Sequence, residues 1–144
     1  VGGYENGGHP WAPDEPITIQ VEDPEHPVTD MLDPTGFVVE DEVFQFQAPY
    51  SREKVRVLLS IDTDRTDMSP ERRFLPERAE DRDFAMSWIK TYGEGRVFYT
   101  SFGHNIHMYQ DRSLLKHYLA GIQYALGDLE ADATPSAVVE TAGR

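Results

Sequence analysis

The stretch RVFYTSFGHNIHMYQD, from Arg96 to Asp111, joins an apolar run to a helical region through a Gly-His-Asn turn. Its first part, Arg96–Phe102, is rich in aromatic and β-branched residues, which favours a strand. After the turn, Asp111 is a suitable N-cap for a helix. A strand that ends in glycine and polar residues just before a helix is typical of the carboxyl edge of the sheet in an α/β protein, where functional side chains are commonly exposed.

The residues after this turn predict an amphipathic helix that ends at Gly127, because glycine commonly terminates helices. Before the turn, Phe84–Lys90 and Arg96–Phe102 are β-prone runs on either side of the short loop 92–95, which predicts a β-hairpin. The apolar positions with helical i, i+3, i+4, i+7 spacing are Leu114, Leu115, Tyr118, Leu119, Ile122, Ala125 and Leu126.

Three further segments favour strands. Ile17–Val21 alternates apolar and polar residues, and Lys54–Asp62 is apolar enough for a strand that is covered on both faces. Phe37–Phe46 predicts one strand with an acidic bend in its middle. Thr63–Asp83 has no periodicity and predicts a long surface loop, which is either a solvated excursion or part of a site.

The composition is that of one acidic domain of 144 residues with a formal net charge of -13. This charge, and the absence of a cluster of Lys and Arg, argue against a nucleic acid or an anionic membrane surface as partner. No apolar run reaches the roughly 20 residues of a membrane helix, and no signal sequence opens the chain. We therefore expect a soluble protein, of either the cytoplasm or the periplasm.

The chain contains no cysteine, which excludes disulfides, thiolate metal sites and a cysteine nucleophile. Its opening, VGGYENGGHPW (Val1–Trp11), looks like an interior loop, so we expect an N-terminal half of the domain to precede it. Residues 133–144, which lack periodicity, predict a flexible tail or linker.

Two histidines lie where chemistry is expected. His104 follows the strand at the sheet edge and can act as a general base, a metal ligand or a hydrogen-bond donor to a sugar. Alternatively, it only caps the strand end by bonding local backbone. His9 lies beside Gly7 and Gly8, which let a backbone approach a ligand closely, and near Trp11, whose flat face suits a sugar. The alternative is that His9 belongs to a flexible loop.

The other histidines and an acidic cluster give weaker indications. His107 can join His104 only if the turn between them is helical. We interpret His26, beside a proline, as structural, and His117 as a surface residue of the helix. The carboxylates of residues 40–42 are available for chemistry, but their spacing does not select one of them.

Six stretches occur in the order and spacing typical of the ThuA-like, or trehalose-utilisation, family, which the sequence resembles from about Val1 to about Asp132. The resemblance implies a flavodoxin-like α/β sandwich of the class I glutamine amidotransferase type. The chain would be an incomplete C-terminal portion, with a ThuA-like domain at residues 1–132. The stretches are GGYENGGHPW, EDPEHPVT, VEDEVFQF, VRVLLSID, WIKTYGEGRVFYTSFGHN and LLKHYLAGIQYALGDL.

The resemblance also implies which residues form a site, namely His9, Glu42, and His104 with Asn105. His104 is similar in position to the histidine that pairs with a cysteine in glutamine amidotransferases. Because the chain has no cysteine, it cannot hydrolyse glutamine by that route.

The family resemblance therefore predicts a carbohydrate-utilisation domain that processes a sugar or an oxidised sugar in a crevice at the sheet edge, with a small carbohydrate as partner. We expect His104 and Glu42 to transfer protons. Trp11, with Tyr99 or Phe102, would supply apolar faces to the sugar.

The sequence leaves three alternative functions open. His9 and His104, with a carboxylate, could hold a divalent metal such as Zn²⁺ with an open position for water. The domain could instead be a non-catalytic module that binds a sugar or a partner domain. It could also be a scaffold completed by residues outside the chain, whose open sheet edge would favour a homo-oligomer.

Overall fold

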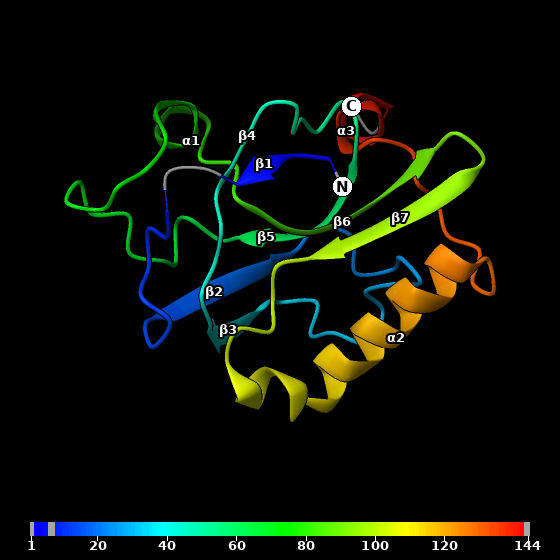
Figure 1. Cartoon of the computed structure of the whole chain (residues 1–144), viewed down its shortest axis with the longest axis horizontal. Coiled ribbons are helices and arrows are strands. Elements are labelled where there is room, and N and C mark those ends of the chain that lie inside the picture. The colour runs from blue at the N-terminus through cyan, green and yellow to red at the C-terminus, as the bar shows by residue number, and fades with distance from the viewer. Residues whose placement is uncertain (1, 6–7, 143–144) are drawn as a thin grey trace.

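Figure 1 shows the computed structural model of the chain, which describes residues 2–5 and 8–142. Five strands form an antiparallel sheet in the order β3-β2-β5-β6-β7, and β1 and β4 pair separately. The strands are β1 (Tyr4–Glu5), β2 (Pro16–Val21), β3 (Phe37–Glu40), β4 (Phe46–Gln47), β5 (Arg56–Ile61), β6 (Ala85–Tyr92) and β7 (Gly95–Thr100). The helices are α1 (Pro76–Asp81), the 3₁₀ helix η1 (Ile106–Tyr109), α2 (Arg112–Leu126) and α3 (Ser136–Ala142).

The central strand is β5, and all of its residues are buried. It pairs with β2 on one side and with β6 on the other, which satisfies its backbone groups inside the protein. The apolar run Lys54–Asp62 predicted this strand correctly. The larger part of the core includes Leu114 and Tyr124 of α2, and a smaller aromatic cluster surrounds Trp88.

The long helix α2 packs against β7 and begins and ends where the sequence predicts (Figure 1). The carboxylate of Asp111 accepts two backbone N–H groups of the first helical turn, at 2.8 and 2.9 Å. Gly127 ends the helix with a φ of 88°, in the left-handed region that favours glycine. On the inner face, Gly121 lies against the ring of Phe98, so closely that a Cβ atom would overlap it.

The hairpin and the first predicted strand are confirmed. β6 and β7 pair antiparallel around a turn at Gly93, whose φ is 59°. Ile17–Val21 lies within β2. The described residues form the mixed α/β structure that the sequence predicts, and none of their helices is long and apolar enough to cross a membrane.

The prediction of a single strand over Phe37–Phe46 is wrong. β3 ends at Glu40 in the main sheet, and β4 begins at Phe46 in the small one. Between them, Asp41 and Gln45 are fully buried and bind the backbone of distant loops. These interactions draw the chain away from the β3 ladder.

The segment Thr63–Asp83 is more ordered than the predicted loop, since it contains α1. Arg72 binds Glu15 at 2.8 Å and Asp67 at 2.7 Å, and its guanidinium lowers the pKa of Glu15 to about 2. The backbone carbonyl of Asp67 accepts the indole N–H of Trp11 at 2.9 Å. This segment therefore fixes the N-terminal part of the chain and is not a solvated excursion.

Within the predicted tail, Ser136–Ala142 forms α3. The N–H of Ser136, at the start of α3, donates to the carbonyl of Val55 at 3.0 Å. The Ser136 hydroxyl accepts the N–H of Val57 at 2.9 Å. Both bonds join the last helix to the beginning of β5, because Ser136 is buried against that strand.

Candidate functional site

The candidate site is built on the turn after β7, and a buried carboxylate fixes that turn. Asp41 is 0% exposed, and its two oxygen atoms accept the N–H groups of Gly103 at 2.6 Å and Asn105 at 2.7 Å. Hydrogen bonds to an ionised acceptor are roughly twice as strong as neutral ones. The backbone on both sides of His104 is therefore held by one side chain from the end of β3.

The Asn105 side chain reinforces this turn. Its Nδ2 group donates to the carbonyl of Pro13 at 2.7 Å and to that of Glu40 at 3.0 Å. Both side-chain N–H groups are thus used inside the protein, so the ligand-binding role predicted for Asn105 would fall to its Oδ1 atom. The residue joins the turn to β3 and to the N-terminal segment.

His104 and Glu42 form a close pair at the surface. His104 Nδ1 lies 2.8 Å from Glu42 Oε2, and the two side chains are 51% and 23% exposed. An ionised carboxylate only accepts hydrogen bonds, so Nδ1 carries the proton in this contact. A neutral His104 ring held in this way leaves the lone pair of Nε2 for another partner.

His9 approaches the same carboxylate from the other side, with its Nε2 3.3 Å from Glu42 Oε1. Its Nδ1 lies 3.2 Å from the carbonyl of Val43, and its ring meets that of Phe44 edge-on at 4.9 Å. Both polar partners of His9 are acceptors. A ring with a proton on each nitrogen satisfies both partners, whereas a neutral ring satisfies one.

The structure thus brings together His9, Glu42 and His104, the residues that the family resemblance implied. Both imidazoles contact the oxygen atoms of Glu42, and they do not surround a common centre. Among residues 2–5 and 8–142, no group of three or more His, Asp or Glu side chains is arranged to hold a metal ion.

The aromatic side chains predicted to offer apolar faces to a sugar are buried or stacked on other rings. Trp11 is 1% exposed and packs against Phe74 and Phe84, so its ring belongs to the core and offers no face to a sugar. Tyr99 is half-buried and stacks on Trp88 with ring centroids 4.1 Å apart. Phe102, the alternative to Tyr99, is also buried.

Of the two glycines before His9, the structure describes Gly8. Gly7 lies outside the described residues. Gly8 has a φ of 73°, and a Cβ atom there would meet nothing within 4 Å. Its left-handed conformation therefore favours glycine, whereas no side chain crowds the position.

The two buried histidines, His26 and His117, have structural roles. Val28 lies between them, because its N–H donates to His26 Nδ1 at 3.2 Å and its carbonyl accepts from His117 Nδ1 at 2.7 Å. Burial lowers the pKa of His26 and lowers that of His117 to about 4. The prediction for His26 fits these contacts, whereas the prediction of a surface position for His117, which is 0% exposed, is wrong.

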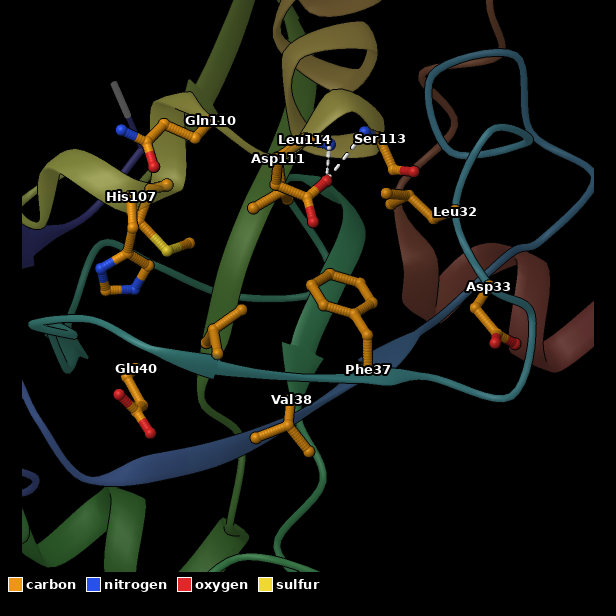
Figure 2. Close-up of a pocket in the computed structure, with 12 residues that line it drawn as sticks. Leu32, Asp33, Phe37, Val38, Glu40, His107, Gln110, Asp111, Ser113 and Leu114 are labelled. Atoms are coloured by element: carbon orange, nitrogen blue, oxygen red, sulfur yellow. Dashed lines mark hydrogen bonds between the residues drawn. The ribbon is translucent and has the colours of Figure 1, made fainter.

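A groove of about 520 Å³ lies between β3 and the start of α2 (Figure 2). Sequence reasoning did not identify it, because its two walls are far apart in the chain. Its polar lining residues are Asp33, Glu40, His107, Gln110, Asp111 and Ser113, and its apolar ones are Leu32, Phe37, Val38, Val39, Met108 and Leu114.

Fold and site together define an α/β domain with a histidine–carboxylate pair at the edge of its sheet. A family model described as trehalose utilisation, ThuA, matches residues 1–125, and the chain belongs to this family. A search of the solved structures matches a ThuA-like protein from Bacteroides uniformis ATCC 8492. No curated protein matches the chain.

The match to the solved structure has a TM-score of 0.56 at 24% sequence identity, and it covers 77% of this chain. It covers 43% of the other chain, so the present sequence spans less than half of that protein. This likeness confirms the predicted amidotransferase-like α/β fold. Membership of the family supports a general role in carbohydrate utilisation.

Proposed function

We propose that the chain is a carbohydrate-processing domain in which His104, oriented by Glu42, exchanges a proton with a sugar or an oxidised sugar. The observation that carries the proposal is the 2.8 Å contact between His104 Nδ1 and Glu42 Oε2. This contact places the proton of the neutral ring on Nδ1 and leaves Nε2 as the base. The half-exposed position of His104 gives a ligand access to that nitrogen.

The proposed step uses the pair as a positioned base. Nε2 of His104 takes a proton from a sugar hydroxyl, or from the C–H next to the carbonyl of an oxidised sugar, and later returns it. The charge of Glu42 stabilises the imidazolium that forms, as a carboxylate does for the histidine of a catalytic triad. His9 contributes by holding the second oxygen of Glu42, so it is a positioning residue.

The test separates proton transfer from binding. The protein is incubated in ²H₂O with keto sugars, D-fructose first, and NMR measures deuterium incorporation next to the carbonyl. We expect His104→Gln, which retains hydrogen-bonding groups but no base, to slow incorporation by about a hundredfold. Affinity for the sugar should change far less.

Glu94→Gln, an exposed change in the β6–β7 turn, is the matched control and should leave incorporation unchanged. Equal incorporation by the wild type and His104→Gln would refute the proposal. Sugar binding by the wild type without any incorporation would instead support the non-catalytic binding module.

A further inference from the structure

We infer that the groove between β3 and the start of α2 is a subsite for an uncharged saccharide unit beside the His104–Glu42 pair. The inference rests on the carbohydrate part of the proposed function, and it names where and in what form the sugar is bound. A volume of about 520 Å³ lies in the range of small-molecule sites.

The groove and the pair are neighbours in the structure. Glu40 lines the groove, and Glu42 follows two residues later, so their Cα atoms are at most about 7.6 Å apart. The Asn105 side chain, next to His104, donates to the Glu40 carbonyl at 3.0 Å. His107, three residues after His104, also lines the groove. A ligand can therefore occupy the groove and reach the pair.

The lining combines an apolar wall with hydrogen-bonding side chains, as a sugar requires. Figure 2 shows Phe37 and His107 pointing into the space between β3 and the start of α2. The C–H face of a sugar ring can pack on the Phe37 ring. The exposed side chains of His107 and Gln110 offer acceptors and donors to sugar hydroxyls.

The charge of the lining selects against anionic ligands. Asp33 and Asp111 contribute carboxylates, whereas none of the twelve lining residues drawn in Figure 2 is Lys or Arg. A sugar phosphate would bring further negative charge close to these groups, and part of that repulsion persists at physiological salt. The groove therefore suits a neutral sugar better than its phosphate.

The experiment compares trehalose with trehalose 6-phosphate at the same ionic strength. The ¹⁵N-labelled chain is titrated with each sugar, and backbone amide shifts are followed by NMR. We expect trehalose to shift the amides of residues 37–40 and 107–114, and to bind about tenfold more tightly than its phosphate.

Two pairs of variants separately test the apolar wall of the groove and the negative charge of its lining. Phe37→Leu retains an apolar side chain without the ring and should weaken trehalose binding about fivefold, whereas Tyr92→Leu at the exposed hairpin end should not. Asp33→Lys, on an exposed side chain, should increase affinity for the phosphate about tenfold. Glu94→Lys, with the same charge change outside the groove, should have no such effect.

Several outcomes would overturn the inference. They are the absence of shifts in the groove, equal affinity for both sugars, and groove shifts that appear on raising the protein concentration without sugar. The last result would show that a second copy of the chain occupies the groove.

The same titration with His104→Gln separates this inference from the proposed function. Because His104 is not among the lining residues, groove binding should persist in that variant. Binding of trehalose in the groove, without deuterium incorporation by the wild type, would refute only the proposed proton transfer. Deuterium incorporation that depends on His104, without amide shifts in the groove, would refute only the proposed subsite.

Discussion

The carboxylate of Asp41 accepts the backbone N–H of Asn105 at 2.7 Å from a fully buried position. Its other oxygen accepts the N–H of Gly103 at 2.6 Å. One side chain after β3 therefore determines where His104 lies, although the two segments are separated by 62 residues.

Asp41→Asn should destabilise the protein by about 2 kcal/mol. The asparagine has nearly the same volume, but its NH₂ group faces a backbone N–H donor, so one buried donor loses its acceptor. Urea unfolding gives the free energy, and Asp128→Asn, on an exposed side chain, is the control. A loss below about 0.5 kcal/mol would contradict the anchoring role.

Glu42→Gln should reduce proton transfer by His104 about a hundredfold and change the tautomer of its ring. The amide no longer requires the proton on Nδ1, because its NH₂ group can also donate to that nitrogen. Histidine ¹⁵N chemical shifts report the tautomer directly. If the His104 resonances in the variant equal those of the wild type, Glu42 does not orient the ring.

Stability should fall as the pH is lowered from about 6.5 towards 4. Burial lowers the pKa of His117 to about 4, whereas the unfolded chain titrates near 6.5. Between these values the unfolded state binds more protons, so the free energy of unfolding decreases as the pH falls. The full difference amounts to about 3 kcal/mol for His117, and the lowered pKa of His26 adds to it in the same direction.

His117→Gln is the variant that isolates this effect. It removes the titrating group and should lower stability at pH 7, since the contacts with Val28 and Ser87 are disturbed. Its stability should then change less between pH 7 and pH 5 than that of the wild type. Parallel urea titrations at the two pH values measure both quantities. An identical pH dependence in the two proteins would exclude His117 as its source.

Zinc should not stabilise the protein measurably. His9 and His104 each contact a different oxygen of Glu42, so one ion could bind both rings only after these contacts are rearranged. The measurement is the melting temperature with and without stoichiometric Zn²⁺. An increase that is lost in a His9→Ala, His104→Ala double variant would show that the two rings do form a metal site.

Gly121→Ala should destabilise the protein by about 2 kcal/mol, although alanine has the higher helix propensity. A Cβ atom at position 121 would overlap the ring of Phe98, and overpacking of this kind costs more than the gain of about 1 kcal/mol in propensity. Gln123→Ala, at an exposed position of the same helix, is the control. Thermal unfolding of both variants tests the prediction.

The elements that the sequence predicted well are those with a strong local pattern. β5 is rich in apolar residues, the β6–β7 hairpin has a short glycine-containing loop, and α2 has an N-cap, regular apolar spacing and a terminal glycine. The break between β3 and β4 has no such signal. It depends on what Asp41 and Gln45 bind elsewhere in the fold, and local sequence does not contain that information.

The candidate site was likewise predicted only in part. Family resemblance selected His9, Glu42 and His104, whereas spacing alone could not tell which of three consecutive acids turns inwards. The prediction that Trp11 offers a face to a sugar is wrong, because its burial depends on the distant rings of Phe74 and Phe84.

His117 is predicted on the wrong face, because the apolar spacing marks a different face of the helix from the one that is buried. It shares its helix face with Leu114, Gly121 and Tyr124, at i−3, i+4 and i+7, and all three are buried. By contrast, most of the apolar residues whose spacing predicted the helix are exposed, among them Leu115, Leu119, Ile122 and Leu126.

The order Glu40, Asp41, Glu42 places three different tasks on consecutive residues, namely the groove, the buried anchor and the partner of His104. Insertion or deletion of a single residue between Val39 and this triplet would exchange these tasks, because it would bring a different carboxylate to the position of the anchor. Loops near the site can vary in length during evolution, whereas this short segment can change only by substitution. The position of the acidic triplet relative to the end of β3 is therefore a feature by which relatives that retain the site can be distinguished from those that have lost it.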